Sequence, residues 1–116
     1  LKMHGFVGRL AFVTNGRPMI LPVNYIFDQD SIVFRTAPDS TLGDLGEGTP
    51  VAFEVDSSRP REGWSVLVQG TATEVRDAEE IERLRRGPLE SWAEPVSDEW
   101  IRISIEEISG RRILED

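Results

Sequence analysis

The chain contains no cysteine and only one histidine, His4. The missing thiols exclude disulfides, thiolate nucleophiles and zinc–thiolate sites, and their absence fits a cytoplasmic protein. One imidazole near the N-terminal end cannot build a histidine–carboxylate metal cluster, and a Ser/His/Asp triad would have to use this same residue. Because a lone terminal histidine is usually solvated surface, we predict no metal site.

Basic residues and long apolar runs are also scarce. The 116 residues include 13 Lys and Arg against 21 Asp and Glu, a net charge of −8. General binding to nucleic acid or to an anionic membrane needs a basic face, so we expect neither partner. No apolar run approaches the roughly 18–20 residues of a membrane-spanning helix. No secretion signal and no glycine-rich nucleotide loop is visible, which again favours a cytoplasmic location.

Short β-prone segments separated by turn residues make up most of the chain. The predicted strands cover 8–14, 18–27, 31–36, 50–57, 64–76 and 100–105, with a possible short one at 108–114. Asn15-Gly16 predicts a type I′ hairpin turn between the first two strands. Pro22 lacks an N–H and therefore indicates an edge, a bulge or an opening to a ligand. Gly70 predicts a bulge or a close backbone approach.

Two short helices accompany these strands. Asp77 can cap a helix over 78–86, and Asp39 or Ser40 can cap another that ends near Leu45. A length of 116 residues suits one domain, and we assign 1–116 to it. Hairpin-like connections favour a mainly β, antiparallel barrel over a doubly wound parallel sheet.

The segment from Arg35 to Thr41 is the best candidate for binding a ligand. A strand presents Arg35 and Thr36, and Ser40 and Thr41 follow at the start of the short helix. A guanidinium, hydroxyls and helix-start N–H groups together can bind a phosphate dianion. The alternative is a surface arginine beside an ordinary helix cap, and spacing alone does not separate the two.

Three tryptophans, Trp64, Trp92 and Trp100, need a place in so small a protein. Filling the core or an interface is the default for such large rings. Trp64 and Trp100 each begin a predicted strand, so both can instead form a wall of a flat aromatic ligand's site. Both interpretations stay open from sequence.

Several segments, taken in order, resemble the pyridoxamine 5′-phosphate oxidase-like family, and especially its short, actinobacterial-type members with a flavin-binding split barrel. They are 8–13, 16–18, 21–25, 33–36, 40–42, 63–70, 100–103 and 110–111. No single segment is diagnostic, but their order and spacing cover nearly the whole chain. The resemblance therefore implies the FMN-binding split-barrel fold and a homodimer with FMN in a cleft between the subunits.

The resemblance also implies a role for particular residues. It assigns the strand that lines the flavin to Leu21, Pro22, Val23, Asn24 and Tyr25. It assigns the ribityl-phosphate contacts to Arg35 and Thr36, and the phosphate-binding turn to Ser40 and Thr41. Ser65 would contact the flavin from the partner's side of the cleft, and Gly110 and Arg111 would close the isoalloxazine pocket.

Two departures from the family pattern bear on function. Family members commonly place Lys or Arg in the phosphate turn, whereas this chain has Thr41 there, so one charge-assisted hydrogen bond is missing. Arg35 is the local cation that can compensate. The vitamin B6 oxidases of the family also carry a C-terminal segment that recognises pyridoxal phosphate, and no such segment follows Arg112. We therefore do not expect pyridoxamine-phosphate oxidase activity.

The resemblance favours a flavin-dependent oxidoreductase that acts on a small molecule which the sequence does not identify. No titratable side chain stands out as an acid or base, so no catalytic residue is assigned. The alternatives are a non-catalytic module that binds a flavin, a deazaflavin or haem, and a dimeric split barrel with an empty cleft.

Overall fold

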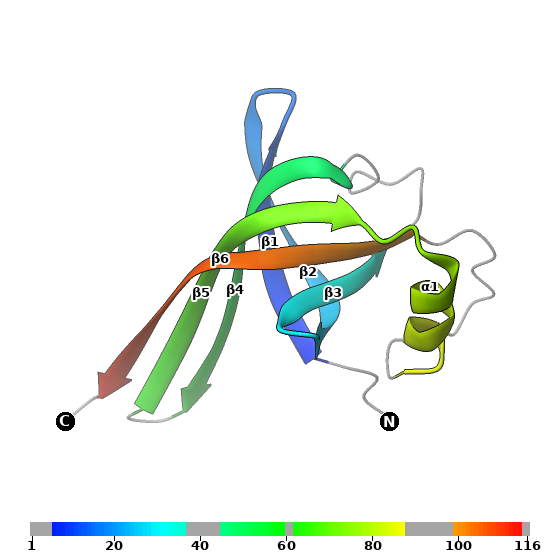
Figure 1. Ribbon diagram of the computed structural model, residues 1–116. Coiled ribbons are helices and arrows are strands. Elements are labelled where there is room, and N and C mark those ends of the chain that lie inside the picture. Colours follow the sequence, from blue (N-terminus) through cyan, green and yellow to red (C-terminus); the bar gives the residue numbers. More distant parts are fainter. Residues whose placement is uncertain (1–5, 37–44, 60–61, 88–98, 115–116) are drawn as a thin grey trace.

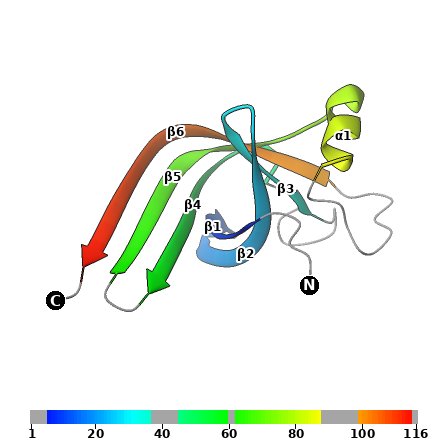
Figure 2. The ribbon, with the colours of Figure 1, turned by 90° about the horizontal axis from the view of Figure 1, so that it is seen from below.

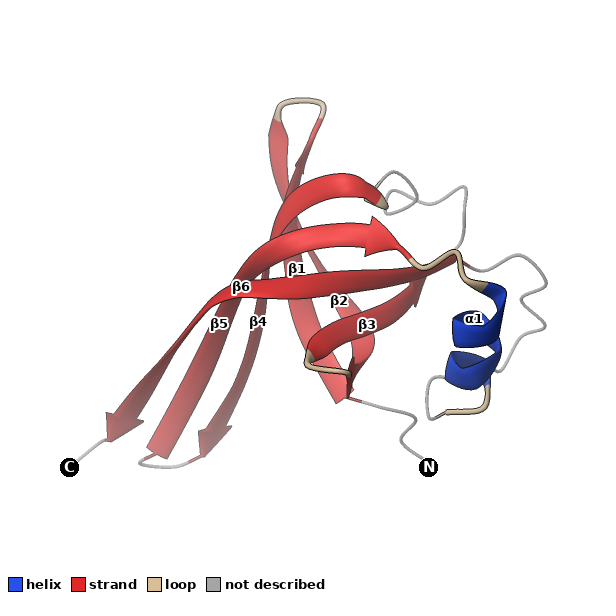
Figure 3. Cartoon of the chain, in the orientation of Figure 1, coloured by secondary structure: helices blue, strands red, loops and turns tan. Residues whose placement is uncertain are grey.

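The computed structural model describes residues 6–36, 45–59, 62–87 and 99–114. Within them the elements are β1 (Phe6–Thr14), β2 (Arg17–Asp28), β3 (Ser31–Thr36), β4 (Glu47–Arg59), β5 (Glu62–Glu74), α1 (Ala78–Arg85) and β6 (Glu99–Leu114). Figure 3 shows how strands dominate the chain. The strands are antiparallel and close into a barrel in the order β1-β2-β3-β6-β5-β4 (Figure 1). The predicted antiparallel barrel is thus confirmed.

Local turn chemistry sets the first three strands. Asn15 and Gly16 have φ values of 53° and 75°, as a type I′ hairpin turn requires, so the predicted turn is confirmed. Gln29 and Asp30 repeat this geometry between β2 and β3, with φ values of 54° and 62°. The prediction for 31–36 matches β3 to the residue.

The predicted helices had different outcomes. The helix after Asp77 is confirmed as α1, and the Asp77 carboxylate accepts a hydrogen bond of 2.9 Å from the Glu80 N–H. The other predicted helix falls almost wholly on 37–44, outside the described residues; Leu45 lies in a turn before β4. No helix in the described parts of the chain is long and apolar enough to cross a membrane.

Strands β4, β5 and β6 continue beyond the barrel as a three-stranded arm, at the end of the molecule away from α1 (Figure 2). We predicted 100–105 and 108–114 as separate strands, but β6 runs without a break from Glu99 to Leu114. Its register against β5 shifts between Gln69 and Gly70. A Cβ atom on Gly70 would lie 1.8 Å from the Ser104 carbonyl oxygen, so both predictions for Gly70, a bulge and a close approach, are confirmed.

Two apolar cores hold these elements together. The first fills the barrel and includes Leu10, Phe34 and Phe53. The second lies outside the barrel wall, where Leu84 of α1 packs with Ile26, Val33, Val75 and Trp100. Trp100 is 1% exposed, so it fills this second core, whereas Trp64 on the arm is 45% exposed. Full burial of one such side chain contributes about 1.5–3 kcal/mol or more to folding.

An ion-pair network fastens α1 to the barrel. The Asp28 carboxylate accepts hydrogen bonds of 2.6 and 3.1 Å from Arg83 of α1. Arg102 of β6 donates to the Asp28 carboxylate at 3.1 Å and to the Asp28 carbonyl oxygen at 2.9 Å, and it also pairs with Glu80. The Arg83 hydrogen bond, aided by Arg102, holds the pKa of the Asp28 carboxyl below its ordinary value.

This network predicts a pH dependence of stability. Because the folded-state pKa of Asp28 is lowered, its stabilising effect is complete above the unfolded pKa of about 3.9 and is lost as the pH falls through the folded pKa. Asp28→Asn should therefore lower the free energy of unfolding by roughly 1–3 kcal/mol at neutral pH, with a smaller difference at about pH 3. Urea unfolding at both pH values measures it, with Asp30→Asn in the same turn as the control. A difference that is equal at both pH values would contradict this role.

Candidate functional site

Part of strand β2 has an unpaired edge. From Arg17 to Asn24, β2 pairs along one side with β1, and β3 joins its other side only from Tyr25 onward. Within the described residues, no strand pairs with that side of 17–24. Pro22 lies in this stretch, so its predicted edge position is confirmed. Free backbone N–H and C=O groups along such an edge can bind a ligand.

The alternation along β2 divides its predicted flavin-lining residues between two faces. Leu21 and Val23 pack against the barrel core, and Tyr25 is buried within it, 4.9 Å from Phe53 between ring centroids. Burial raises the pKa of the Tyr25 phenol. The side chains of Pro22 and Asn24 are exposed on the outer face of the barrel. The inward residues can therefore meet an outer ligand only through their backbone.

Arg35 lies on the same outer face as Asn24. The β2–β3 ladder ends at Tyr25 and Phe34, and one more step in the same register would set Asn24 opposite Arg35. Thr36, by contrast, is 7% exposed and lies on the barrel-core side with Phe34. The structure thus sets Pro22, Asn24 and Arg35 on one face of the barrel, with Arg35 one residue past the end of the β2–β3 ladder, and we refer to these three as the barrel group. The predicted phosphate turn, Ser40 and Thr41, lies outside the described residues.

Arg35 stacks on a buried aromatic ring. It is the cross-strand partner of Trp100 in β6, and its guanidinium carbon lies 5.0 Å from the centroid of the Trp100 ring. A cation within about 6 Å of an indole face is attracted by the ring quadrupole. The predicted cation therefore lies at the end of β3, against the Trp100 ring.

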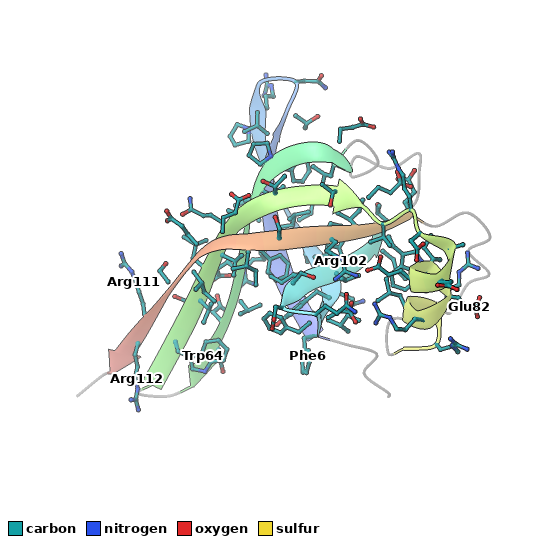
Figure 4. The ribbon with its side chains drawn as sticks, in the orientation of Figure 1. Phe6, Trp64, Glu82, Arg102, Arg111 and Arg112 are labelled. Atoms are coloured by element: carbon teal, nitrogen blue, oxygen red, sulfur yellow. The ribbon has the colours of Figure 1, made fainter. Side chains whose placement is uncertain are left out.

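Ser65 and Arg111 lie on the arm, far from the barrel group. They are cross-strand partners in β5 and β6, so their side chains share one face of the arm, whereas Gly110 pairs with Val66. Figure 4 shows Arg111 on the arm, at the opposite end from α1. Arg111 follows Trp100, the partner of Arg35, by eleven positions, or about 36 Å of extended strand. We call Ser65 and Arg111 the arm group; one chain does not bring it to the barrel group.

The outer face between the two groups is apolar, which the sequence analysis missed. A pocket of about 270 Å³ opens there, lined by Arg9, Ala11, Ile20, Ala52, Phe53, Glu54 and Leu67. Ile20 is 66% exposed and Leu67 is 39% exposed. A sequence signal existed: β1, β2 and β5 carry apolar residues on both of their faces, where a barrel wall exposed to water would alternate apolar with polar.

Charges of both signs flank this apolar face. Arg9 forms an ion pair of 2.8 Å with Glu54 and another with Asp56. Burial raises the pKa of Glu54, whereas the hydrogen bond from Arg9 lowers the pKa of Asp56. Asp56 is the cross-strand partner of Ser65, and Ser65 is the cross-strand partner of Arg111. An acidic and a basic side chain therefore lie in one row across the arm. The described residues contain no group of three or more His, Asp or Glu side chains that could hold a metal ion.

The barrel group fits a flat heteroaromatic ligand that carries a phosphate. The unpaired edge of β2 offers backbone donors and acceptors to a ring, and the exposed Pro22 offers it an apolar surface. Arg35 supplies a guanidinium beside that edge, and Arg–phosphate pairs form strong, directional hydrogen bonds. Ring and phosphate can thus be met by neighbouring residues of one chain.

Comparison with known proteins identifies relatives along nearly the whole chain. Residues 2–112 match the family described as pyridoxamine 5′-phosphate oxidase. The chain is 34% identical to Rv0080, an uncharacterized protein of Mycobacterium tuberculosis, over 116 residues that cover 94% of this chain and 76% of that protein. The structure of this chain is similar to that of the FAD binding protein from Mycobacterium smegmatis, with a TM-score of 0.84 and 30% identity over 95% of this chain and 87% of the other. An FAD-binding protein from Mesorhizobium loti gives a TM-score of 0.75 and 26% identity over 94% and 85% of the two chains.

Proposed function

The chain belongs to the pyridoxamine 5′-phosphate oxidase family, and from this premise we propose that it binds a flavin, FMN, in a cleft completed by a second copy of itself. The observation that carries the proposal is the Arg35 guanidinium beside the unpaired edge of β2. The two similar FAD-binding proteins support a flavin. The choice of FMN rests on the resemblance of the 21–25 and 33–36 segments to FMN-binding members of the family.

The separation of the two groups supports a homodimer. The barrel group and the arm group both match flavin-contacting positions in the family. Arg35 of the barrel group lies beside the start of β6, at Trp100, whereas Arg111 of the arm group lies near the end of β6. A two-fold axis can place the arm group of one copy against the barrel group of the other, since such an interface uses the same surface twice. The apolar outer face supplies the surface to bury, because monomers rarely expose large apolar patches. Arg111 supplies a positive charge on that surface, and Glu54 and Asp56 supply negative charges there.

The proposed activity is that of a flavin-dependent oxidoreductase. When bound, the flavin would supply the hydride or electron transfer, and the protein would orient the ring and exclude water from the cleft. The residues of this chain then bind and orient: Arg35 holds the phosphate, and the backbone of β2 holds the edge of the ring. The substrate is a small molecule that stacks on the exposed face of the ring.

Non-catalytic flavin binding is the second candidate, and one observation favours it. The barrel group consists of a proline, an asparagine and an arginine, none of which is a usual general acid or base. The barrel group therefore supplies no acid or base of its own. A carrier or sensor of a flavin, or of a deazaflavin or haem, needs none.

The visible absorption spectrum of the purified protein, taken before and after titration with FMN, tests the proposal. We expect flavin bands that shift saturably with FMN, and riboflavin to bind about 10- to 100-fold more weakly because it lacks the phosphate. FAD titrated in parallel decides between the two flavin nucleotides. A Soret band would redirect the assignment to haem, and an unchanged spectrum at high FMN would overturn it. Anaerobic reduction followed by reoxidation with candidate acceptors separates an oxidoreductase from a carrier.

A further inference from the structure

We infer that the apolar pocket on the outer face of the barrel is a substrate pocket for small aromatic molecules that are uncharged or cationic, and that it disfavours anions, phosphate esters included. The inference rests on the proposed function and names the substrate class that the proposal leaves open. Three features carry it: how the pocket is formed, where it lies, and how its charges are paired.

Two alanines form the floor of this pocket. Ala11 of β1 and Ala52 of β4 are cross-strand partners on the outer face. The larger side chains of Ile20 on β2 and Leu67 on β5 stand on either side of them, and all four line the hollow of about 270 Å³. Since an apolar cavity of about 150 Å³ can bind benzene, this volume accommodates one or two aromatic rings.

The pocket adjoins the place proposed for the flavin ring. Pro22, which offers its exposed surface to that ring, is the cross-strand partner of Arg9, and Ile20 lies two residues before Pro22 on the same face. Both Arg9 and Ile20 line the pocket. Neighbouring strands are about 4.8 Å apart and two residues along a strand span about 7 Å, so a molecule in the pocket would lie next to a ring over Pro22.

The cation that lines the pocket is already paired with carboxylates. Arg9 donates from Nε to Glu54 Oε1 at 3.0 Å, its Nη2 lies 2.8 Å from the same oxygen, and Nη2 also bonds to Asp56. When both carboxyls are ionised, two negative charges share one guanidinium. Arg111, on the same face, is two strand spacings or roughly 10 Å across from Asp56. The excess negative charge repels an anion at the pocket and leaves a neutral or cationic ring acceptable.

Three probes with one ring and different charges test the substrate class: benzylamine is a cation, benzyl alcohol is neutral and benzoate is an anion. We expect benzylamine and benzyl alcohol to bind the wild type more tightly than benzoate by roughly threefold to tenfold, because the charges at the pocket are partly exposed and act through solvent. Ligand-observed NMR titrations, without and with FMN, give the dissociation constants. Benzoate binding as tightly as the other two overturns the inference.

Removing the two carboxylates reverses the expected order. In Glu54→Gln/Asp56→Asn the Arg9 guanidinium is released, so benzoate should bind more tightly than benzylamine, again by roughly threefold to tenfold. Glu79→Gln/Glu82→Gln, which removes two exposed carboxylates from α1, is the control of equal charge and should keep the wild-type order. An order that stays the same in the pocket variant, or that reverses in the control, contradicts the pairing argument.

Filling the pocket identifies where the probes bind. Ala52→Leu places a larger side chain on the floor, and all three probes should lose about tenfold or more in affinity. Thermal unfolding and light scattering check the fold and the oligomeric state of the variant, and Ala11→Leu fills the same floor from β1 if Ala52→Leu does not fold. Unchanged probe affinities in the folded variant place the probes elsewhere and overturn the inference.

The outcomes separate this inference from the function on which it rests. A wild type that does not bind FMN overturns the proposed function, whereas the order of the three probes still tests the pocket. With FMN bound, each probe should shift the flavin absorption bands, because the two rings are neighbours. Probes that bind without such a shift make the pocket a ligand site apart from the flavin and overturn its role as the substrate pocket. If none of the probes binds, the pocket is filled by the second copy and the inference fails alone.

Discussion

Replacing Arg35 with alanine is expected to weaken FMN binding by about one to two orders of magnitude, because a charge-assisted hydrogen bond contributes about 1.5–3 kcal/mol. Thr41 occupies the position at which the family resemblance implies a Lys or Arg, so Arg35 is the cation on which this prediction depends. Riboflavin affinity should change little. Arg35→Lys keeps the charge but loses the planar fork, and it should lie between wild type and Arg35→Ala. Titrations followed by flavin fluorescence measure the FMN and riboflavin affinities of the wild type and of both variants.

The control for Arg35 is another arginine with no proposed role. Arg85→Ala, in the exposed last turn of α1, should change FMN affinity by less than about twofold if long-range charge effects are screened. Because Arg35 is half-buried on Trp100, thermal unfolding of each variant checks that the fold is retained. Equal losses of FMN affinity in the Arg35 and Arg85 variants would show that only net charge matters, and would refute the phosphate assignment.

Ile20→Glu is expected to abolish both the dimer and FMN binding. Ile20 is 66% exposed at the mouth of the outer apolar pocket, within the face proposed to meet the second copy. An unpaired carboxylate buried in that interface would weaken dimerisation by roughly 100-fold or more. In the proposed dimer the arm group comes from the partner, so loss of the dimer would remove that half of the site. Light scattering and FMN titration on the same samples of Ile20→Glu measure both effects.

Ile108→Glu provides a matched comparison. The exposed fraction of Ile108, 61%, is similar to that of Ile20. Ile108 is the cross-strand partner of Val68, however, so it lies on the other face of the arm. We expect this variant to remain dimeric and to bind FMN. A wild-type protein that is monomeric at micromolar concentration yet binds FMN tightly would exclude the shared site, as would an Ile20→Glu protein that stays dimeric.

The elements that sequence predicted well are those controlled by neighbouring residues. The type I′ turn at Asn15-Gly16 needs two residues that accept positive φ, and the cap at Asp77 needs one carboxylate near the first N–H groups of α1. The division of β6 into two strands was wrong, because a break near Ile105 was inferred from the local pattern. Its continuity depends on Gly70 in another strand, over which the β6 backbone passes closely.

The β pattern, the hairpin turns, the capped helix and the family can be inferred from the sequence alone, because each depends on local conformational preference or on residues in a recognisable order. Which residues of the candidate site meet depends on the tertiary structure. It placed Arg35 against Trp100, left residues 17–24 of β2 without a second strand partner among the described residues, and set the arm group near the far end of β6. These relations join residues from different strands, and the ladder registers and the packing of the second core set them. No local spacing in the chain encodes them.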